Sequence, residues 1–125
     1  MAALLLNISG NWAHFRKCET NNNPLSHDFI TKTALIGLIG AVIGYERSEM
    51  KDKFPILSED LIYSVAVNNA VVKESWGFTL RSIKEMFKKS RWQIELLKNP
   101  DFDIVIACVN DRSNKDFELF CNNIQ

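Results

Sequence analysis

The sequence predicts one α+β domain, from the order of its apolar and polar segments. Short apolar runs at residues 3–8, 61–72 and 103–109 are typical of buried strands. A charge-free stretch at residues 33–45 and a polar segment with spaced phenylalanines at 114–123 are typical of helices. The resulting order is β-α-β-β-α, the ferredoxin-like or RNA-recognition-motif order with the fourth strand missing.

The composition is that of an ordinary globular chain of 125 residues, with 46% hydrophobic and 24% charged residues and a formal net charge of zero. Three cysteines without CxxC spacing indicate neither a disulfide framework nor a zinc site. The amino terminus lacks a basic leader, and residues 33–45 are too few to span a membrane. We therefore expect a soluble cytoplasmic protein, with no membrane association and no cofactor.

The charge-free stretch contains Gly37, Gly40 and Gly44, whose spacing places them on one face of a helix. Thr31 or Thr33 can cap this helix, which we expect to run to about Met50 and to be followed by a loop at residues 51–60. The pattern is neither GxGxxG nor a P-loop, so nucleotide binding is not indicated. Glycines on one face predict a helix surface thinned for close packing.

Basic residues concentrate in one part of the chain. Residues 73–98 hold seven basic and three acidic side chains, whereas residues 99–125 hold two basic and five acidic ones. This distribution suggests a local anionic partner, and a solvated helix face is the alternative. Within this part, Leu80, Ile83 and Phe87 could form a helical face, while Trp76, Gly77 and Phe78 favour a protruding hairpin or loop.

The segment HFRK, His14 to Lys17, places an imidazole, an aromatic ring and two cations at the end of an extended stretch. Rings and guanidinium planes stack on bases while cations meet phosphates, so this mixture suits RNA. The alternative is an exposed strand end whose Phe15 points into the core. His14 and His27 could also act in acid–base RNA cleavage with Tyr45 or a lysine, but no catalytic order or metal-ligand spacing supports this.

Two blocks of the sequence resemble the amino-terminal signature of the fifth family of CRISPR-associated (Cas) proteins. In that family a G-x-x-A-x-F-R-like strand end leads through a Thr/Pro-rich loop into a T-A-L-x-G-L-x-G-A-x-x-G helix. The matching residues are Gly10, Ala13, His14, Phe15, Arg16 and Lys17, followed by Thr33, Ala34, Leu35, Gly37, Leu38, Gly40, Ala41 and Gly44.

The resemblance implies an RNA-recognition-like domain spanning residues 1–125, whose insert at about residues 73–92 is a basic thumb. Members of the family grip the 5′ handle of the guide RNA in type I Cascade and contact its family-seven backbone subunit and family-eight large subunit. The implied RNA-binding residues are His14, Phe15, Arg16, Lys17, Lys32, Arg81, Lys84, Lys88, Lys89 and Arg91.

Family members are nearly twice as long as this sequence, and the difference falls after the second expected helix. Without its fourth strand, the sheet would leave strand one as an unpaired edge, which can recruit partners by strand addition. We therefore expect a binding protein without enzymatic activity or a small-molecule substrate. A truncated subunit mimic that inhibits interference is slightly favoured over an authentic short or split subunit, and a guide-RNA endoribonuclease ranks last.

Overall fold

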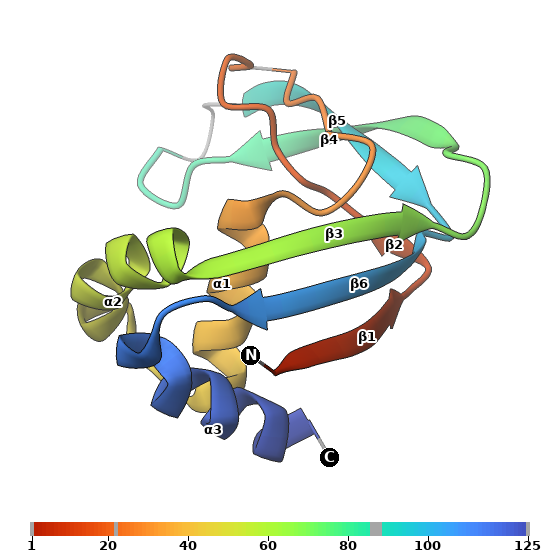
Figure 1. The fold of residues 1–125 in the computed structure, drawn as a ribbon. Coiled ribbons are helices and arrows are strands. Elements are labelled where there is room, and N and C mark those ends of the chain that lie inside the picture. Colours follow the sequence, from red (N-terminus) through yellow and green to blue (C-terminus); the bar gives the residue numbers. More distant parts are fainter. Residues whose placement is uncertain (1, 22, 86–88, 125) are drawn as a thin grey trace.

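The computed structural model describes residues 2–21, 23–85 and 89–124, and Figure 1 shows their arrangement. The elements in chain order are β1 (Ala3–Ser9), β2 (Trp12–Ala13), α1 (Lys32–Ile43), α2 (Arg47–Asp60), β3 (Leu61–Val67), β4 (Lys73–Arg81), β5 (Lys89–Lys98), β6 (Asp101–Cys108), a 3-10 helix η1 (Asp111–Ser113) and α3 (Asn114–Ile124).

A three-stranded antiparallel sheet with the order β1-β6-β3 forms the centre of the fold. Its middle strand β6 is the most buried, because Phe102, Ile104 and Ile106 point into the core beneath the helices. The order corresponds to strands one, three and two of a ferredoxin-like sheet, so the α+β class predicted from the sequence is confirmed. Among the described residues, the outer edge of β1 has no strand partner.

The basic segment forms a β-hairpin, which settles the choice that the sequence left open. β4 and β5 pair along their length, and β2 adds two residues on the other side of β5, giving the order β2-β5-β4. The hairpin runs from Lys73 to Lys98, beyond the expected insert boundary near residue 92. Figure 1 shows it projecting on the far side of β3 from β1. Phe87 lies outside the described residues.

The prediction of one helix to about Met50 followed by a loop was wrong, because the chain forms two helices. Thr31 caps α1 as expected, its hydroxyl accepting from the Ala34 N–H at 3.3 Å. Glu46 and Glu49 then form a reciprocal capping box that starts α2, which continues through residues 51–60. Pro55 inside α2 hides this helix in the sequence, since proline ordinarily breaks helices.

The three glycines have three different environments, so close packing is correct only for Gly40. A Cβ on Gly40 would collide with the thioether of Met50, which shows that α1 and α2 are in close contact there. Gly37 faces open space, and Gly44 ends α1 with a φ of 93°, a left-handed conformation that favours glycine. The expected thin face at Gly37 and Gly44 is therefore corrected to an exposed site and a helix stop.

A buried carboxylate joins the two corners where helices meet the central sheet. Asp60, at the end of α2, has no exposed surface and accepts hydrogen bonds from Asn110 (2.7 Å), Ser113 (2.6 Å) and Arg112 (Nε, 2.7 Å). Its backbone carbonyl also accepts from Val109 at 2.8 Å. Arg112 holds the pKa of Asp60 far below its usual range, although burial opposes this effect.

Two further properties concern the helices and the cysteines. No helix among the described residues is long and apolar enough to cross a membrane. Cys18, Cys108 and Cys121 are all free thiols, and Cys108 is buried.

Replacing the buried carboxylate should destabilise the fold more than replacing its exposed neighbour. Asp60→Asn places an amide N–H₂ against the donors of Arg112 and Ser113, so the thermal midpoint should fall by roughly 10 °C. Glu59→Gln removes only a 2.6 Å contact between exposed side chains and should shift the midpoint by about 2 °C or less. Thermal unfolding followed by circular dichroism measures both, and equal midpoints would contradict the role of Asp60.

The comparison of the wild type with Asp60→Asn also predicts how stability depends on pH. Because the folded-state pKa of Asp60 is depressed, its stabilising effect is fully present above the unfolded carboxyl pKa of about 4 and is lost as the pH falls toward the folded value. The midpoint difference between wild type and Asp60→Asn should be constant from about pH 8 to 5 and shrink below about pH 4.

The glycines provide an independent check of the two-helix arrangement. Gly37→Ala fills open space in a helix and should raise the free energy of unfolding by about 0.5–1 kcal/mol. Gly44→Ala forces a side chain into the left-handed region and should lower it by about 1 kcal/mol or more. Urea titration gives both values, and a loss at Gly37 would mean that this face of α1 is covered.

Candidate nucleic-acid interface

The segment from His14 to His27 folds back on itself beside the hairpin sheet. Arg16 and Ser26 form an isolated antiparallel bridge. The Lys17 N–H donates to the Leu25 carbonyl at 2.8 Å, and the His27 N–H donates to the Phe15 carbonyl, also at 2.8 Å. The asparagine- and proline-rich turn therefore lies between two extended arms, which present HFRK on one arm and His27 on the other.

Lys73 at the base of β4 fixes this folded segment to the hairpin. Its ammonium lies 2.6 Å from Asp28 Oδ1, 3.6 Å from Glu95 Oε1 and 3.0 Å from the Ser26 carbonyl oxygen. Glu95 accepts in turn from the Ser26 N–H at 3.1 Å. The hydrogen bond to Asp28 raises the pKa of Lys73, so this cation holds the loop rather than being available to a ligand.

An open groove of ≈ 380 Å³ lies between this segment and the start of α1, and it brings together predicted site residues. His14, Arg16 and His27 line it, together with Thr31 and Thr33. The first turn of α1 contains no acidic residue, so the positive end of the helix dipole faces this region, although Glu19 and Asp28 interact with the nearby His27. One guanidinium, two imidazoles and a helix amino terminus together are suited to a phosphate group.

Of the other predicted residues of this region, Phe15 also lines the groove, whereas Lys17 and Lys32 do not. Lys17 lines a neighbouring pocket with His27. The Phe15 ring packs against Phe102, with ring centroids 6.1 Å apart, as the alternative interpretation of HFRK expected. Lys32 donates to the Ser58 carbonyl at 2.6 Å and so connects α1 to α2.

Three of the predicted cations of the thumb, Arg81, Lys89 and Arg91, lie on one face of the hairpin. Arg81 pairs with Lys89, and Arg91 pairs with Thr79, so these side chains share the face that carries Lys73 and Glu95 near the base. Lys84 is exposed between the strands, and Lys88 lies outside the described residues. The cationic face therefore continues the side of the hairpin to which the folded segment is attached.

The groove contains both histidines that the sequence suggested for acid–base chemistry, but not Tyr45. His14 Nδ1 donates to the Glu95 carbonyl at 2.7 Å, which leaves Nε2 for a ligand. Tyr45 donates to Asp116 at 2.5 Å, and this bond raises the tyrosine pKa and joins the end of α1 to α3. Among the described residues, no group of three His, Cys, Asp or Glu side chains could hold a metal ion.

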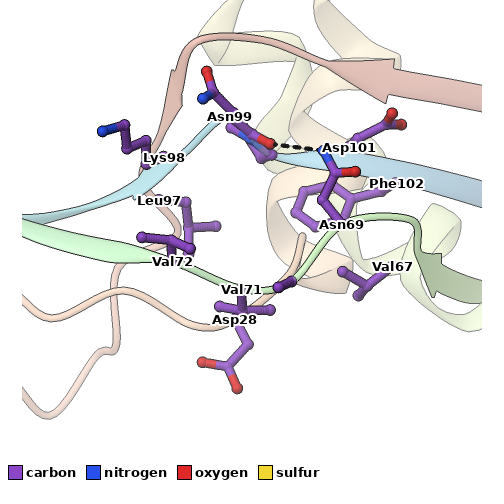
Figure 2. A pocket seen from close by; sticks show the side chains of 12 residues that line it. Asp28, Val67, Asn69, Val71, Val72, Leu97, Lys98, Asn99, Asp101 and Phe102 are labelled. Atoms are coloured by element: carbon purple, nitrogen blue, oxygen red, sulfur yellow. Dashed lines mark hydrogen bonds between the residues drawn. The ribbon is translucent and has the colours of Figure 1, made fainter.

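A separate pocket lies where the two sheets meet. Figure 2 shows it between the β3–β4 connection and the β5–β6 turn, where Asn69 donates to the Asn99 carbonyl at 3.3 Å. Asn99 forms this turn with a φ of 47°. The free space is ≈ 10 Å³, about that of one water molecule, so the pocket is a packed junction and too small for an organic ligand.

The structure also reveals a surface that the sequence did not predict, which we call the aromatic face. Cross-strand partners share a face, so Phe78 lies beside Trp92, and Trp76 lies beside Ile94. Trp12, opposite Lys98, joins the same face and contacts Trp76 edge-on at 5.0 Å between centroids. Alternation of Trp76, Phe78 and Leu80 along β4 is the sequence signal that could have identified it.

The structure is that of a ferredoxin-like domain with a basic hairpin and a groove lined by Arg16, His14 and His27. Residues 3–91 match the family described as "CRISPR-associated protein (Cas_Cas5)". The chain therefore belongs to this CRISPR-associated family, as the sequence blocks indicated.

The solved structures agree with this assignment at the level of the fold. One similar chain comes from a structure titled "CRISPR RNA-guided surveillance complex", with a TM-score of 0.72 and 13% sequence identity. The match covers 94% of this chain and 53% of that one, so this chain spans about half the length of its structural relative. A search of curated proteins finds no match.

Loss of the Lys73 ammonium should loosen the folded segment without unfolding the domain. In Lys73→Met the three contacts to residues 26, 28 and 95 disappear, and amide hydrogen exchange in residues 25–28 should accelerate by about tenfold. Lys98→Met is the matched control, because Lys98 contacts only the half-exposed Glu74 at 3.1 Å in the interactions observed. Unchanged exchange in Lys73→Met would show that the backbone bridge alone fixes the segment.

Proposed function

We propose that this chain binds the 5′ handle of a guide RNA and engages neighbouring subunits of a type I CRISPR effector, without catalysing a reaction. The observation that carries the proposal is the groove at the start of α1, where Arg16 and two histidines meet the positive end of a helix. The cationic face of the hairpin extends this surface. Family membership makes guide RNA the natural polyanion.

The proposed RNA path runs from the groove to the hairpin. A phosphate in the groove would meet the Arg16 guanidinium and the His14 Nε2 edge, while the following phosphates would meet Arg81, Lys89 and Arg91. Hydrogen bonds to Glu95 hold His14 and Ser26 in place, so the groove is formed before a ligand arrives. This preorganisation favours binding. The proposed role is in the cytoplasm, and the free cysteines are consistent with that reducing compartment.

A non-catalytic role is favoured over RNA cleavage by the position of the hydroxyl and lysine groups. Tyr45 and Lys53 both contact Asp116, with Lys53 at 3.2 Å, so they hold α3 rather than face the groove. The Tyr45 hydroxyl, which the sequence offered as a partner for the two histidines, is therefore not available to them in the groove.

The effect of this chain on the effector depends on which contacts of the normal subunit it makes. The β1 edge, residues 3–9, carries neither charge nor proline to block strand addition, so it suits docking on a neighbouring subunit. A protein that occupied the handle-binding position without making all the contacts of the normal subunit would compete with that subunit. We therefore favour a subunit mimic that inhibits interference, and an authentic short or split subunit is the alternative.

RNA affinity should depend on these cations in a salt-dependent way. Arg16→Gln, and separately the double variant Arg81→Gln with Arg91→Gln, should weaken binding of a handle-sequence oligonucleotide several-fold. Each should reduce the slope of log K against log salt by about 0.7 per lost phosphate contact. Lys51→Gln removes an equal charge from the exposed side of α2 and should change neither quantity. Fluorescence anisotropy at four salt concentrations measures both, and unchanged slopes in the first two variants would argue against an RNA role.

Assembly of the effector distinguishes inhibition from support. Purified chain is added during assembly of a type I complex, with and without the normal family-five subunit, and binding of target DNA is measured. An inhibitor lowers target binding in the complete mixture as its concentration rises and restores nothing when the normal subunit is omitted. Restored target binding in the omission mixture would instead establish an authentic subunit.

A further inference from the structure

The aromatic face, made of Trp12, Trp76, Phe78 and Trp92, carries an inference that rests on the proposed RNA-binding function. All three tryptophans of the chain lie on this one face of the hairpin sheet. Trp12, Trp76 and Phe78 remain 40%, 48% and 41% exposed, and no described element covers them. Exposed apolar side chains that gather on one surface are typical of an interaction site.

The charges of the hairpin identify the class of ligand. In its outer half, the strand residues 75–81 and 89–94 contain Arg81, Lys89 and Arg91 and no acidic residue, and the turn between the strands carries Lys84 and Glu85. The acidic Glu74 lies at the base, where Lys98 neutralises it at 3.1 Å. An aromatic surface backed by a face with more cations than carboxylates complements a ligand that combines flat rings with negative charge, which is a single-stranded nucleic acid.

The central sheet does not provide such a surface. In RNA-recognition domains, aromatic side chains on the open face of the sheet stack on bases. Here the outward side chains are aliphatic, Leu5, Ile62 and Val105, and Asp101 and Asp103 lie on the same face. A phosphate chain would be repelled by these carboxylates, so the hairpin is the better place for bases.

The geometry of the hairpin allows one strand of RNA to use both of its faces. β4 is an edge strand in the order β2-β5-β4, and along it Phe78 and Leu80 alternate with Thr79 and Arg81. Two residues that are adjacent in the sequence of β4 therefore point to opposite faces of the hairpin. A nucleotide crossing this edge can place its phosphate at Arg81 and Arg91 and turn its base onto Phe78 and Trp76.

We propose that the aromatic face is a stacking platform for unpaired bases of the bound guide RNA, working with the cations on the reverse face. The recognition is by ring stacking and is therefore tolerant of base identity. Trp76 and Phe78 provide the two exposed ring surfaces next to the β4 edge, and Trp12 supports Trp76 edge-on.

Tryptophan fluorescence tests the proposal directly, because every tryptophan of the chain belongs to this sheet. The full chain is titrated with a single-stranded RNA of the handle sequence and with an abasic ribose-phosphate oligomer of the same length. We expect the RNA to quench the emission and to bind about tenfold more tightly than the abasic oligomer. This comparison requires no variant, so it is independent of any folding defect.

Single substitutions identify which side chains cause the difference in affinity between RNA and the abasic oligomer. Trp76→Ala and Phe78→Ala should each weaken RNA binding about fivefold or more, leave binding of the abasic oligomer unchanged and leave the salt slope unchanged. Trp76→Phe should retain most of the affinity because a ring remains. Leu119→Ala, which removes a similarly exposed apolar side chain on α3, is the control and should have no effect.

Three outcomes would overturn the proposal. Equal affinity for RNA and the abasic oligomer means that phosphates alone are bound, so stacking fails while the proposed function stands. Absence of measurable binding to both oligomers removes the proposed function itself. If Trp76→Ala leaves RNA affinity unchanged but reduces capture by purified effector subunits, the face binds protein.

Discussion

The buried carboxylate of Asp60 is the interaction on which the arrangement of helices and sheet most depends. It ends α2 immediately before β3 begins, and its partners Asn110, Arg112 and Ser113 come from the connection between β6 and α3. The Asp60 side chain therefore fixes both the junction between α2 and β3 and the connection between β6 and α3. Because a buried charge is tolerated only when it is fully hydrogen-bonded, any displacement of either corner is opposed by the cost of leaving Asp60 unsatisfied.

A second set of contacts holds the groove at the start of α1. Lys73 and Glu95 connect the hairpin to the folded segment that contains Ser26 and Asp28. The groove at the start of α1 is consequently bordered by elements that are each held from two sides. This arrangement accounts for a site formed from residues distant in sequence, such as His14 and His27, without a deep pocket or a metal centre among the described residues.

The family assignment and the two-sided hairpin explain different aspects of the proposed function. The match to the CRISPR-associated family covers residues 3–91, which include the glycine-containing helix and β4 of the hairpin. The strand register places all three tryptophans on one face of the hairpin sheet. In the proposed complex, rings and cations on opposite faces would each meet a different part of a nucleotide, since bases stack on rings and phosphates pair with cations.

The sequence by itself determined the fold class, the three strands of the central sheet, the Thr31 cap and the presence of a basic insert, because these depend on local periodicity and side-chain chemistry. The resemblance carried by HFRK and the glycine pattern also identified the family correctly. Only the tertiary structure decided the separate roles of Gly37, Gly40 and Gly44, the existence of α2 around Pro55, and the division of the hairpin into aromatic and cationic faces. These features depend on what packs against a residue or lies across from it on another strand, and strand register is set by contacts distant in sequence.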